Sequence, residues 1–461
     1  MVVLSTIATK ILSLIYLIFV ARYLGDTGFG QYSFVFALLS FFVVFTAFGM
    51  DALIVREVAK DKSKSSAFLI NSSVLKTLLC LSSWAVLLVL AFFLNKPPEI
   101  KIGIMIIGFC LLPDSLVKTA KAVFSGHEKM EYNTFIEVIY RLAIVAVGIF
   151  FIKYDYGIVG LFSVPLFASF GVFILTIFLY VKKIGGIELS FDIGLLRYLL
   201  KTSYAFALTG VFVAIYHRID AVMLSFMKGD APVGWYSAAY GLTESLLFIP
   251  AALVSAAFPV LSRFFNESKD DFQRAYRKLF QFLLLFALPI AIGITILAEP
   301  IVSLIYKAEF SNAVPALRAL VWATAFMFLN TVMSSTLYAA NRQKTVAGLT
   351  AILVAVNILL NLILIPRYSH VGASWATVMT EMVGFGYCYW FIAQHLCKNN
   401  VRVLFLKALL SSFVMALFLL MATLNLFLLI GLGALLYLAA LVALKAFTKE
   451  DRDFMRRLFS F

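Results

Sequence analysis

The feature that most constrains this chain is a succession of apolar segments, each long enough to cross a membrane, with short polar connections between them. A membrane-spanning helix needs about 20 apolar residues. Hydrophobic residues make up 63% of the 461 residues and charged residues only 13%, and the mean hydropathy is +0.99. A water-soluble fold is excluded, because a globule of this size cannot bury so much apolar surface. We predict an all-α polytopic membrane protein of the cell membrane.

The polar breaks divide the chain into about fourteen expected transmembrane helices. These spans are residues 2–21, 31–50, 67–94, 102–124, 133–152, 157–181, 199–217, 233–260, 279–298, 316–339, 346–365, 371–396, 403–422 and 424–446. The first segment is expected to remain as a transmembrane helix, because it lacks a basic flank and a small-residue cleavage site. The longest polar connections, residues 182–197 and 262–278, are too short to hold an enzyme domain.

The distribution of Lys and Arg predicts the orientation. Connections after even-numbered spans, together with the C-terminal tail, hold about 26 of the 38 basic residues, whereas connections after odd-numbered spans hold about 9. Cytoplasmic loops retain positive charge, so both termini are expected in the cytoplasm. The net charge of +14 then reflects topology and contact with anionic lipids of the bilayer, and no nucleic-acid partner is expected.

Two segments have the pattern of helices that lie along the cytoplasmic membrane surface. Residues 188–201 place apolar residues at helical spacing beside Arg197 and Lys201, and residues 448–461 begin with a capping pattern. The alternative is that each segment only extends a neighbouring span.

The chain contains an internal repeat. Residues 25–33 (GDTGFGQYS) and 229–237 (GDAPVGWYS) share five identical residues at an offset of 204, and each copy precedes the second span of a six-span block. Because six is even, both blocks enter the membrane in the same sense. They are therefore expected to be parallel repeats, an arrangement suited to alternating access around a central cavity.

Several segments carry a family resemblance: Ala21 to Gly25, Gly30 to Ser33, Arg218 to Asp220, Gly234 to Tyr240 and Phe258 to Arg263. With their order across two blocks, they resemble the polysaccharide (O-antigen type) flippases of the multidrug/oligosaccharidyl-lipid/polysaccharide exporter (MOP) superfamily. The resemblance implies a MATE-like fold and movement of a polyprenyl-(pyro)phosphate-linked oligosaccharide from the cytoplasmic to the outer leaflet. It also implies association with polysaccharide-assembly proteins.

These observations predict three parts of the chain. The N-terminal lobe comprises residues 1–182 with spans 1–6, and the C-terminal lobe comprises residues 183–400 with spans 7–12 after an interfacial helix. Residues 401–461 add spans 13 and 14 and a basic amphipathic tail.

Ionisable residues inside spans are the candidate substrate site, because each costs on the order of 2.5–3.5 kcal/mol on insertion scales. Lys10 and Lys76 lie within spans 1 and 3, where they line a cavity, snorkel to the interface or form structural pairs. Glu137 and Arg141 are four residues apart in span 5. They either neutralise one another, or Arg141 binds the substrate phosphate while Glu137 holds it in place.

Two further groups carry charge near the ends of spans. Asp114 and Lys118 have the same four-residue spacing in span 4, but Lys118 and Lys121 lie near its predicted cytoplasmic end, where positive residues need no special role. Arg218 and Asp220 end span 7, either as an ion pair that locks one lobe edge or as the solvated end of a helix. Arg218 is a candidate substrate contact and Asp220 a candidate coupling residue.

Two carboxylates have no basic neighbour at helical spacing, Glu244 in span 8 and Glu381 in span 12. A lone carboxylate in a membrane can titrate or hold a cation, so both are candidates for coupling transport to H⁺ or Na⁺. The alternative is that they hydrogen-bond a neighbouring helix.

Motifs for catalysis are missing from the sequence. The four cysteines form no CxxC pair and are expected to be packing residues. HExxH, GxSxG and a P-loop lysine are also absent, so we expect no enzyme, catalytic residue, metal or cofactor. The alternatives are a cation-coupled multidrug exporter of the same superfamily, a peptidoglycan-precursor flippase and an integral-membrane glycosyltransferase or polymerase.

Overall fold

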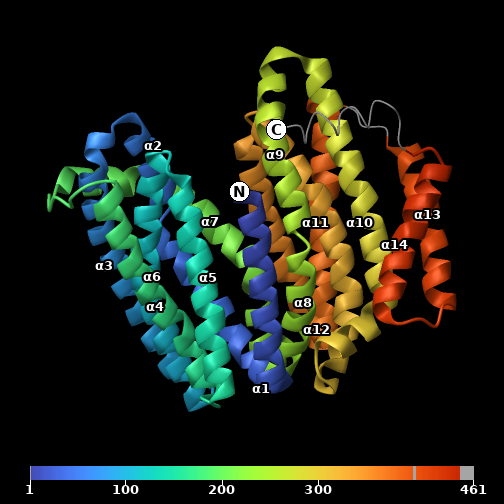
Figure 1. The fold of residues 1–461 in the computed structure, drawn as a ribbon, viewed down its shortest axis with the longest axis horizontal. Coiled ribbons are helices and arrows are strands. Elements are labelled where there is room, and N and C mark those ends of the chain that lie inside the picture. The colour runs from blue at the N-terminus through green and yellow to red at the C-terminus, as the bar shows by residue number, and fades with distance from the viewer. Residues whose placement is uncertain (1, 398–400, 447–461) are drawn as a thin grey trace. The chain divides into compact units, whose positions relative to one another are not determined.

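The computed structural model describes residues 2–397 and 401–446, and this part of the chain is helical with no strand (Figure 1). The helices form two compact units, residues 1–234 and 235–461. The lobe boundaries at 182 and 400 stay predictions. The predicted amphipathic tail, residues 448–461, lies outside the described residues.

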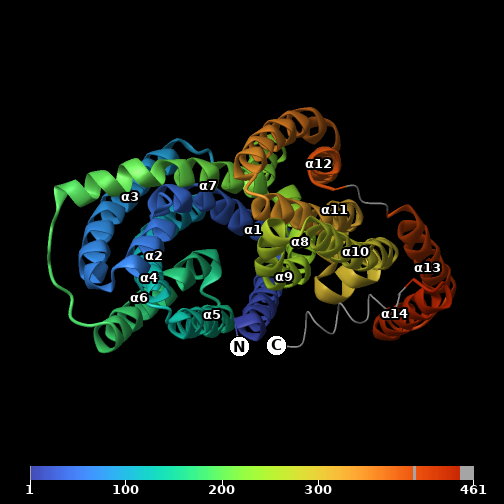
Figure 2. The ribbon, with the colours of Figure 1, turned by 90° about the horizontal axis from the view of Figure 1, so that it is seen from above.

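The first unit is built around one central helix. Its helices are α1 (Val2–Ala47), α2 (Met50–Lys60), α3 (Ser65–Phe93), α4 (Pro98–Gly126), α5 (Met130–Lys153), α6 (Gly157–Lys183) and α7 (Ile193–Lys228), with a short 3-10 helix η1 (Lys62–Lys64). Helix α4 contacts α1, α2, α3, α5 and α6 (Figure 2). Buried apolar residues of α2, α3, α4 and α6, such as Ile54, Phe68, Phe124 and Tyr180, form its core.

The second unit packs α10, α11 and α12 together. Its helices are α8 (Asp230–Ser245, which begins in the first unit), α9 (Phe248–Glu267), α10 (Lys269–Ile305), α11 (Ala313–Ala339), α12 (Gln343–His395), α13 (Arg402–Met421) and α14 (Leu426–Ala443), with a 3-10 helix η2 (Ala308–Asn312). Helices α13 and α14, outside the predicted repeat, contact each other and α10 (Figure 1, red).

Two helices are too long for a single crossing. At 1.5 Å per residue, α1 and α12 would extend about 70 and 80 Å, whereas the hydrocarbon core is about 30 Å thick. Each contains one non-helical residue, Gly25 or Ser369, at a kink that separates two helices. Twelve described helical stretches are long and apolar enough to span a membrane; division of the two kinked ones gives fourteen. The number of crossings and the side of the termini stay predictions.

The repeat is visible in the backbone at the first turn of each copy. Gly25 has φ 70° and ψ −178°, and Gly229 has φ 87° and ψ −169°. Side chains rarely tolerate such positive φ values, whereas glycine adopts them readily. The two glycines, 204 residues apart, therefore make the same turn for the same reason.

The two copies also contact each other inside the first unit. A Cβ atom on Gly30 would lie 1.8 Å from the carbonyl oxygen of Asp230, and a Cβ atom on Gly234 would lie 2.0 Å from that of Asp26. These two contacts exchange under the offset of 204. Only glycine permits backbones to approach so closely, which explains why both copies contain it at this position.

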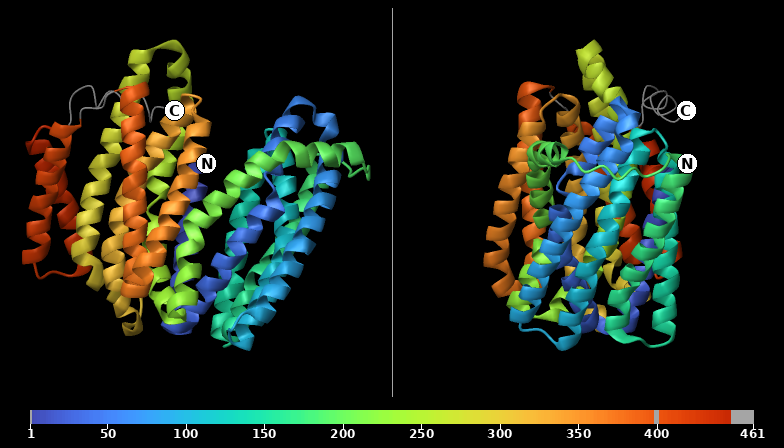
Figure 3. Two further views of the ribbon diagram at one scale, coloured as in Figure 1. Left: turned by 180° about the vertical axis from the view of Figure 1, so that it is seen from behind. Right: turned by 90° about the vertical axis from the view of Figure 1, so that its left-hand side faces the viewer.

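Helix α7 merges a predicted surface segment with a predicted span. The Asp192 side chain caps its first turn by accepting hydrogen bonds from the backbone amides of Gly194 and Leu195. From Ile193 the helix continues without interruption to Lys228 (Figure 3). Residues 193–201 are thus a helical extension of the span, as the alternative reading had it; their position at the membrane surface stays a prediction.

The predicted eighth span is broken. Helix α8 ends at Ser245 and α9 begins at Phe248, with Pro250 in the first turn of α9. Proline has no amide hydrogen and its ring clashes with the carbonyl four residues earlier, here that of Leu246. Glu244 therefore occupies the last turn of a helix next to an irregular segment.

Candidate functional site

A cluster of charged side chains occupies α4 and α5 of the first unit. Glu137 of α5 is shared between two cations: the Lys121 Nζ atom of α4 lies 2.9 Å from its Oε2 atom, and the Arg141 Nε atom lies 3.3 Å from its Oε1 atom. The pair predicted between Glu137 and Arg141 is thus present. Glu137 has Lys121 as an additional partner, which the sequence did not predict. Sequence spacing does not reveal a contact between residues on different helices.

Helix α4 adds two more charges to this cluster. Asp114, Lys118 and Lys121 follow at intervals of four and three residues and so share one face of α4. The Asp114 carboxylate accepts a hydrogen bond from the Ser169 hydroxyl of α6, and Lys118 is exposed. Three basic and two acidic side chains leave the cluster with one net positive charge. We refer to these five residues as the α4–α5 cluster.

The α4–α5 cluster is open to its surroundings. The side chains of Lys121, Glu137 and Arg141 are 25%, 40% and 38% exposed. An anion can therefore approach the two cations without unfolding a helix.

Lys76, in contrast, is enclosed. Its side chain is 0% exposed, and its ammonium group donates a hydrogen bond to the carboxylate of Asp51 on α2. The carbonyl oxygen of Ser115 lies 3.5 Å away. Asp51 is 36% exposed, so within this pair only the acid can meet another molecule. A cavity-lining role for Lys76 stays a prediction.

The other predicted residues of the first unit lie outside the α4–α5 cluster. Lys10 is exposed on α1, Arg218 is half-buried on α7, and Asp220 is buried at 3% exposure. Their predicted roles as substrate contacts and coupling residue stay predictions.

A second, largely enclosed pair, which the sequence did not indicate, lies at the turn before α8. The Lys96 ammonium group, between α3 and α4, bonds the Asp230 carboxylate, with the side chains only 10% and 13% exposed. Asp230 also accepts hydrogen bonds from Ser225 and Gln31, each at 3.2 Å. These contacts fix the turn at which the second repeat begins.

A histidine lies in the polar connection between α4 and α5. The Nε2 atom of His127 is 2.7 Å from the Ser65 hydroxyl oxygen. Burial lowers the pKa of His127 below its ordinary value, and the nearby charges of Lys129 and Lys62 lower it further. The ring therefore favours its neutral form.

In the second unit, Glu381 of α12 is 3% exposed. The amide nitrogen of Asn330 on α11 donates a hydrogen bond of 2.6 Å to its Oε2 atom and one of 3.1 Å to its backbone carbonyl. A hydrogen bond to a neighbouring helix is what the alternative reading anticipated. Coupling through Glu381 is untested by this contact and stays a prediction.

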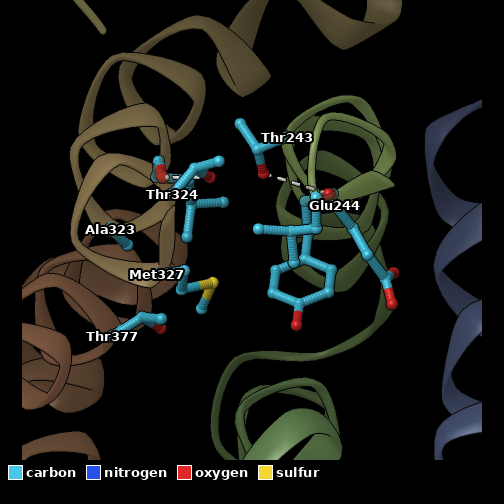
Figure 4. Close-up of a pocket in the computed structure, with 9 residues that line it drawn as sticks. Thr243, Glu244, Ala323, Thr324, Met327 and Thr377 are labelled. Carbon is cyan, nitrogen blue, oxygen red and sulfur yellow. Dashed lines mark hydrogen bonds between the residues drawn. The ribbon is translucent and has the colours of Figure 1, made fainter. Parts of the chain in front are cut away.

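Glu244 borders a small pocket between α8, α11 and α12. The pocket is lined by Tyr240, Thr243, Glu244, Leu247, Leu320, Ala323, Thr324, Met327 and Thr377, and holds about 210 Å³ of empty space including its open mouth. In Figure 4 the Glu244 carboxylate points away from Thr243 and Thr324. Only about 10 Å³ of this space is open to the centre of a water molecule, which is about what a single water needs, so the pocket is too small for an oligosaccharide.

The threonine hydroxyls of this pocket are anchored to their own helices. Thr243 donates to the carbonyl of Tyr240, Thr324 to that of Leu320 and Thr377 to that of Ala373, each at 3.0 Å. A hydroxyl that donates in this way still offers oxygen lone pairs. The pocket therefore has acceptor character. Among the described residues, no group of three or more His, Cys, Asp or Glu side chains has the arrangement of a metal site.

Comparison with known proteins decides the family. The family model described as polysaccharide biosynthesis protein matches residues 1–265. The chain belongs to this family. The model of lipid II flippase MurJ also matches, over residues 142–442.

Individual proteins agree with the family. The chain is 24% identical to a putative O-antigen transporter of Shigella flexneri over 78% of its own length and 88% of the relative. The structure of a lipid II flippase MurJ in an inward closed conformation matches with a TM-score of 0.81, 19% identity and coverage of 98% and 99%. An inward-facing multidrug resistance MATE transporter of the MOP superfamily matches with a TM-score of 0.69, 16% identity and coverage of 84% and 94%.

These matches fix the class of the protein. It is a multi-pass membrane protein with the fold shared by MurJ and MATE transporters, and a flippase of the MOP superfamily. The predicted fold class and family are confirmed.

Proposed function

We propose that this flippase moves a polyprenyl-(pyro)phosphate-linked oligosaccharide from the cytoplasmic to the outer leaflet by alternating access, for synthesis of a cell-surface polysaccharide or glycan. The match to the polysaccharide biosynthesis family supports a glycan substrate, as does the relative named as an O-antigen transporter. The observation that carries the proposal is the open, net positive α4–α5 cluster, because a phosphate headgroup needs cations that it can reach.

The depth of the α4–α5 cluster suits a headgroup taken from the cytoplasmic leaflet. Helix α5 begins at Met130, at its predicted cytoplasmic end. At 1.5 Å per residue, Glu137 lies about 10 Å and Arg141 about 16 Å along the helix. Glu137 falls within the inner half of a hydrocarbon core about 30 Å thick, and Arg141 lies near its middle. The phosphate would be held there while the prenyl chain stays in lipid.

A proton or sodium gradient is the proposed energy source. Glu244, Glu381 and Asp220 remain the coupling candidates. The position of Glu244 beside the break between α8 and α9 supports its candidacy, because interrupted helices line ion and substrate sites in many transporters. Glu244→Gln or Glu381→Gln is expected to abolish the dependence of transport on an imposed gradient. Unchanged gradient dependence would exclude the substituted residue.

A peptidoglycan-precursor flippase is the second candidate function. The MurJ family model covers residues 142–442, and the MurJ structure matches almost the whole chain. Lipid II is itself a polyprenyl-pyrophosphate-linked saccharide, so the same cationic cluster would serve. The two candidates differ in the saccharide alone, and a direct comparison of substrates separates them.

The test is transport in liposomes containing the full-length protein. Labelled lipid-linked oligosaccharide, lipid II and a fluorescent cationic drug are each assayed for appearance at the opposite face. We expect transport of the oligosaccharide, with loss on Arg141→Ala or Lys121→Ala while membrane insertion is intact. Arg263→Ala is the matched control, because Arg263 is 61% exposed and its contacts are a 3.8 Å surface pair with Glu267 and a ring contact with Phe264. Transport of the drug alone would refute the proposal, and full activity of Arg141→Ala would limit Arg141 to balancing Glu137.

A further inference from the structure

Glu137 occupies the position that an anionic ligand of the α4–α5 cluster would take. Its Oε2 atom is 2.9 Å from the Lys121 ammonium group and its Oε1 atom is 3.3 Å from the Arg141 guanidinium group. The two cations come from different helices, and each engages its own oxygen. A phosphate group presents the same pattern, two adjacent oxygens with negative charge, and Arg binds carboxylates and phosphates with the same planar donor geometry.

The ion pairs of the first unit differ in how easily they open. Lys76 is 0% exposed in its pair with Asp51, and Lys96 is 10% exposed in its pair with Asp230. Among the three side chains that pair around Glu137, the least exposed, Lys121, is 25% exposed. Exposed pairs contribute little net stability, so separating Glu137 from its cations costs far less than opening the two enclosed pairs.

A bound phosphate and Glu137 cannot share the two cations. Each cation would face two anions, and like charges at such short range repel each other even near a protein surface. The carboxylate therefore has to leave when the phosphate arrives. Lys118, exposed one turn before Lys121 on the same face of α4, adds positive charge for a second phosphate of a pyrophosphate.

We propose that Glu137 is an internal stand-in for the substrate phosphate. In the empty protein it holds Lys121 and Arg141 in place; the (pyro)phosphate of the lipid carrier displaces it, and its return helps to expel the headgroup after reorientation. The inference rests on the proposed function, because it assigns a step to the same site. It differs from a purely supporting role for Glu137, in which loss of the carboxylate weakens binding.

The test uses farnesyl diphosphate as a probe on the purified full-length protein in nanodiscs. Glu137→Gln removes the competing charge and keeps the size of the side chain, so the dissociation constant is expected to fall about tenfold and the dissociation rate to decrease. Glu131→Gln is the matched control on the same helix, where Glu131 is exposed in the first turn, and its affinity should equal that of the wild type. Unchanged or weaker binding by Glu137→Gln would overturn the inference.

A second variant keeps the inference testable if Glu137→Gln does not fold. Glu137→Asp retains the charge on a shorter side chain that no longer reaches both cations, so its binding of the probe should also tighten, by less. When combined with Lys121→Met, either substitution should lose most of its gain. Tightening that persists on the Lys121→Met background would refute displacement at these cations.

The transport assay distinguishes failure of this inference from failure of the proposed function. If the wild type transports the lipid-linked oligosaccharide and Glu137→Gln leaves the affinity for the probe unchanged, the function holds and the displacement step is wrong. If Glu137→Gln tightens binding but no lipid-linked saccharide is transported, the proposed function fails while displacement at an anion site is supported.

Discussion

Asp51 and Lys76 form an asymmetric ion pair, and we predict that loss of the acid destabilises the protein far more than loss of the base. Asp51→Asn removes the counter-charge of an ammonium group that is 0% exposed and leaves it only neutral acceptors, the new amide oxygen and the Ser115 carbonyl at 3.5 Å. Removing one partner of a buried pair costs about 3–5 kcal/mol. Lys76→Met instead fills the site with an apolar chain of similar size and leaves Asp51, 36% exposed, in contact with solvent. Its cost should be about 1 kcal/mol or less.

The assay is unfolding in mixed micelles by increasing SDS, followed by tryptophan fluorescence. Asp51→Asn should shift the midpoint most, Lys76→Met little, and the double variant should resemble Lys76→Met because the stranded cation is gone. Lys64→Met is the control: it removes a 3.4 Å surface pair with Asp61 in which the lysine is 62% exposed, and should change almost nothing. A Lys76→Met protein as unstable as Asp51→Asn would refute the reasoning.

Three further outcomes are expected. Gly30→Ala should lower the SDS midpoint, because its Cβ atom would lie 1.8 Å from a carbonyl oxygen. Gly171→Ala, inside α6 with nothing within 4 Å, should leave the midpoint unchanged or raise it, because alanine favours a helix over glycine. The pKa of His127, lowered by burial and nearby lysines, should appear below 6.5 in an NMR titration. The free energy of unfolding should therefore decline as the pH falls below 6.5, because the unfolded chain takes up a proton at His127 before the folded protein does. His127→Gln should abolish that decline. Asn330→Leu should cost about 1–3 kcal/mol in SDS unfolding, because buried Glu381 loses a donor at 2.6 Å.

Local sequence patterns predicted the helices and the repeat well. The lengths of the apolar runs predicted the helical segments. Helices α4, α5 and α6 begin and end within a few residues of the predicted spans. Gly25 and Gly229 were matched by letters alone and adopt the same backbone conformation. Pro250 in the eighth span indicated a kink, but hydropathy could not place the break after Ser245, because it averages over a window of residues.

The partners of the charged residues were less predictable. Spacing of four residues identified Glu137 with Arg141, a contact within one helix. It gave no indication of Lys121 with Glu137, 16 residues apart, or of Lys96 with Asp230, 134 residues apart. Such contacts depend on which faces of separate helices meet. Lys121 was assigned to the positive inner boundary of the membrane, and that pattern concealed its pairing.

The reciprocal glycine contacts bear on how mutation scans of this protein should be interpreted. Gly30 against Asp230 and Gly234 against Asp26 are one contact made twice, as at the interface of a twofold symmetric dimer. Neither glycine has a side chain that can bind a substrate or an ion. Substitutions there should nevertheless abolish transport as completely as those at charged residues, and they would do so without changing the affinity for any ligand. Loss of transport with binding retained would therefore indicate disrupted backbone packing at Gly30 and Gly234 rather than a damaged binding site.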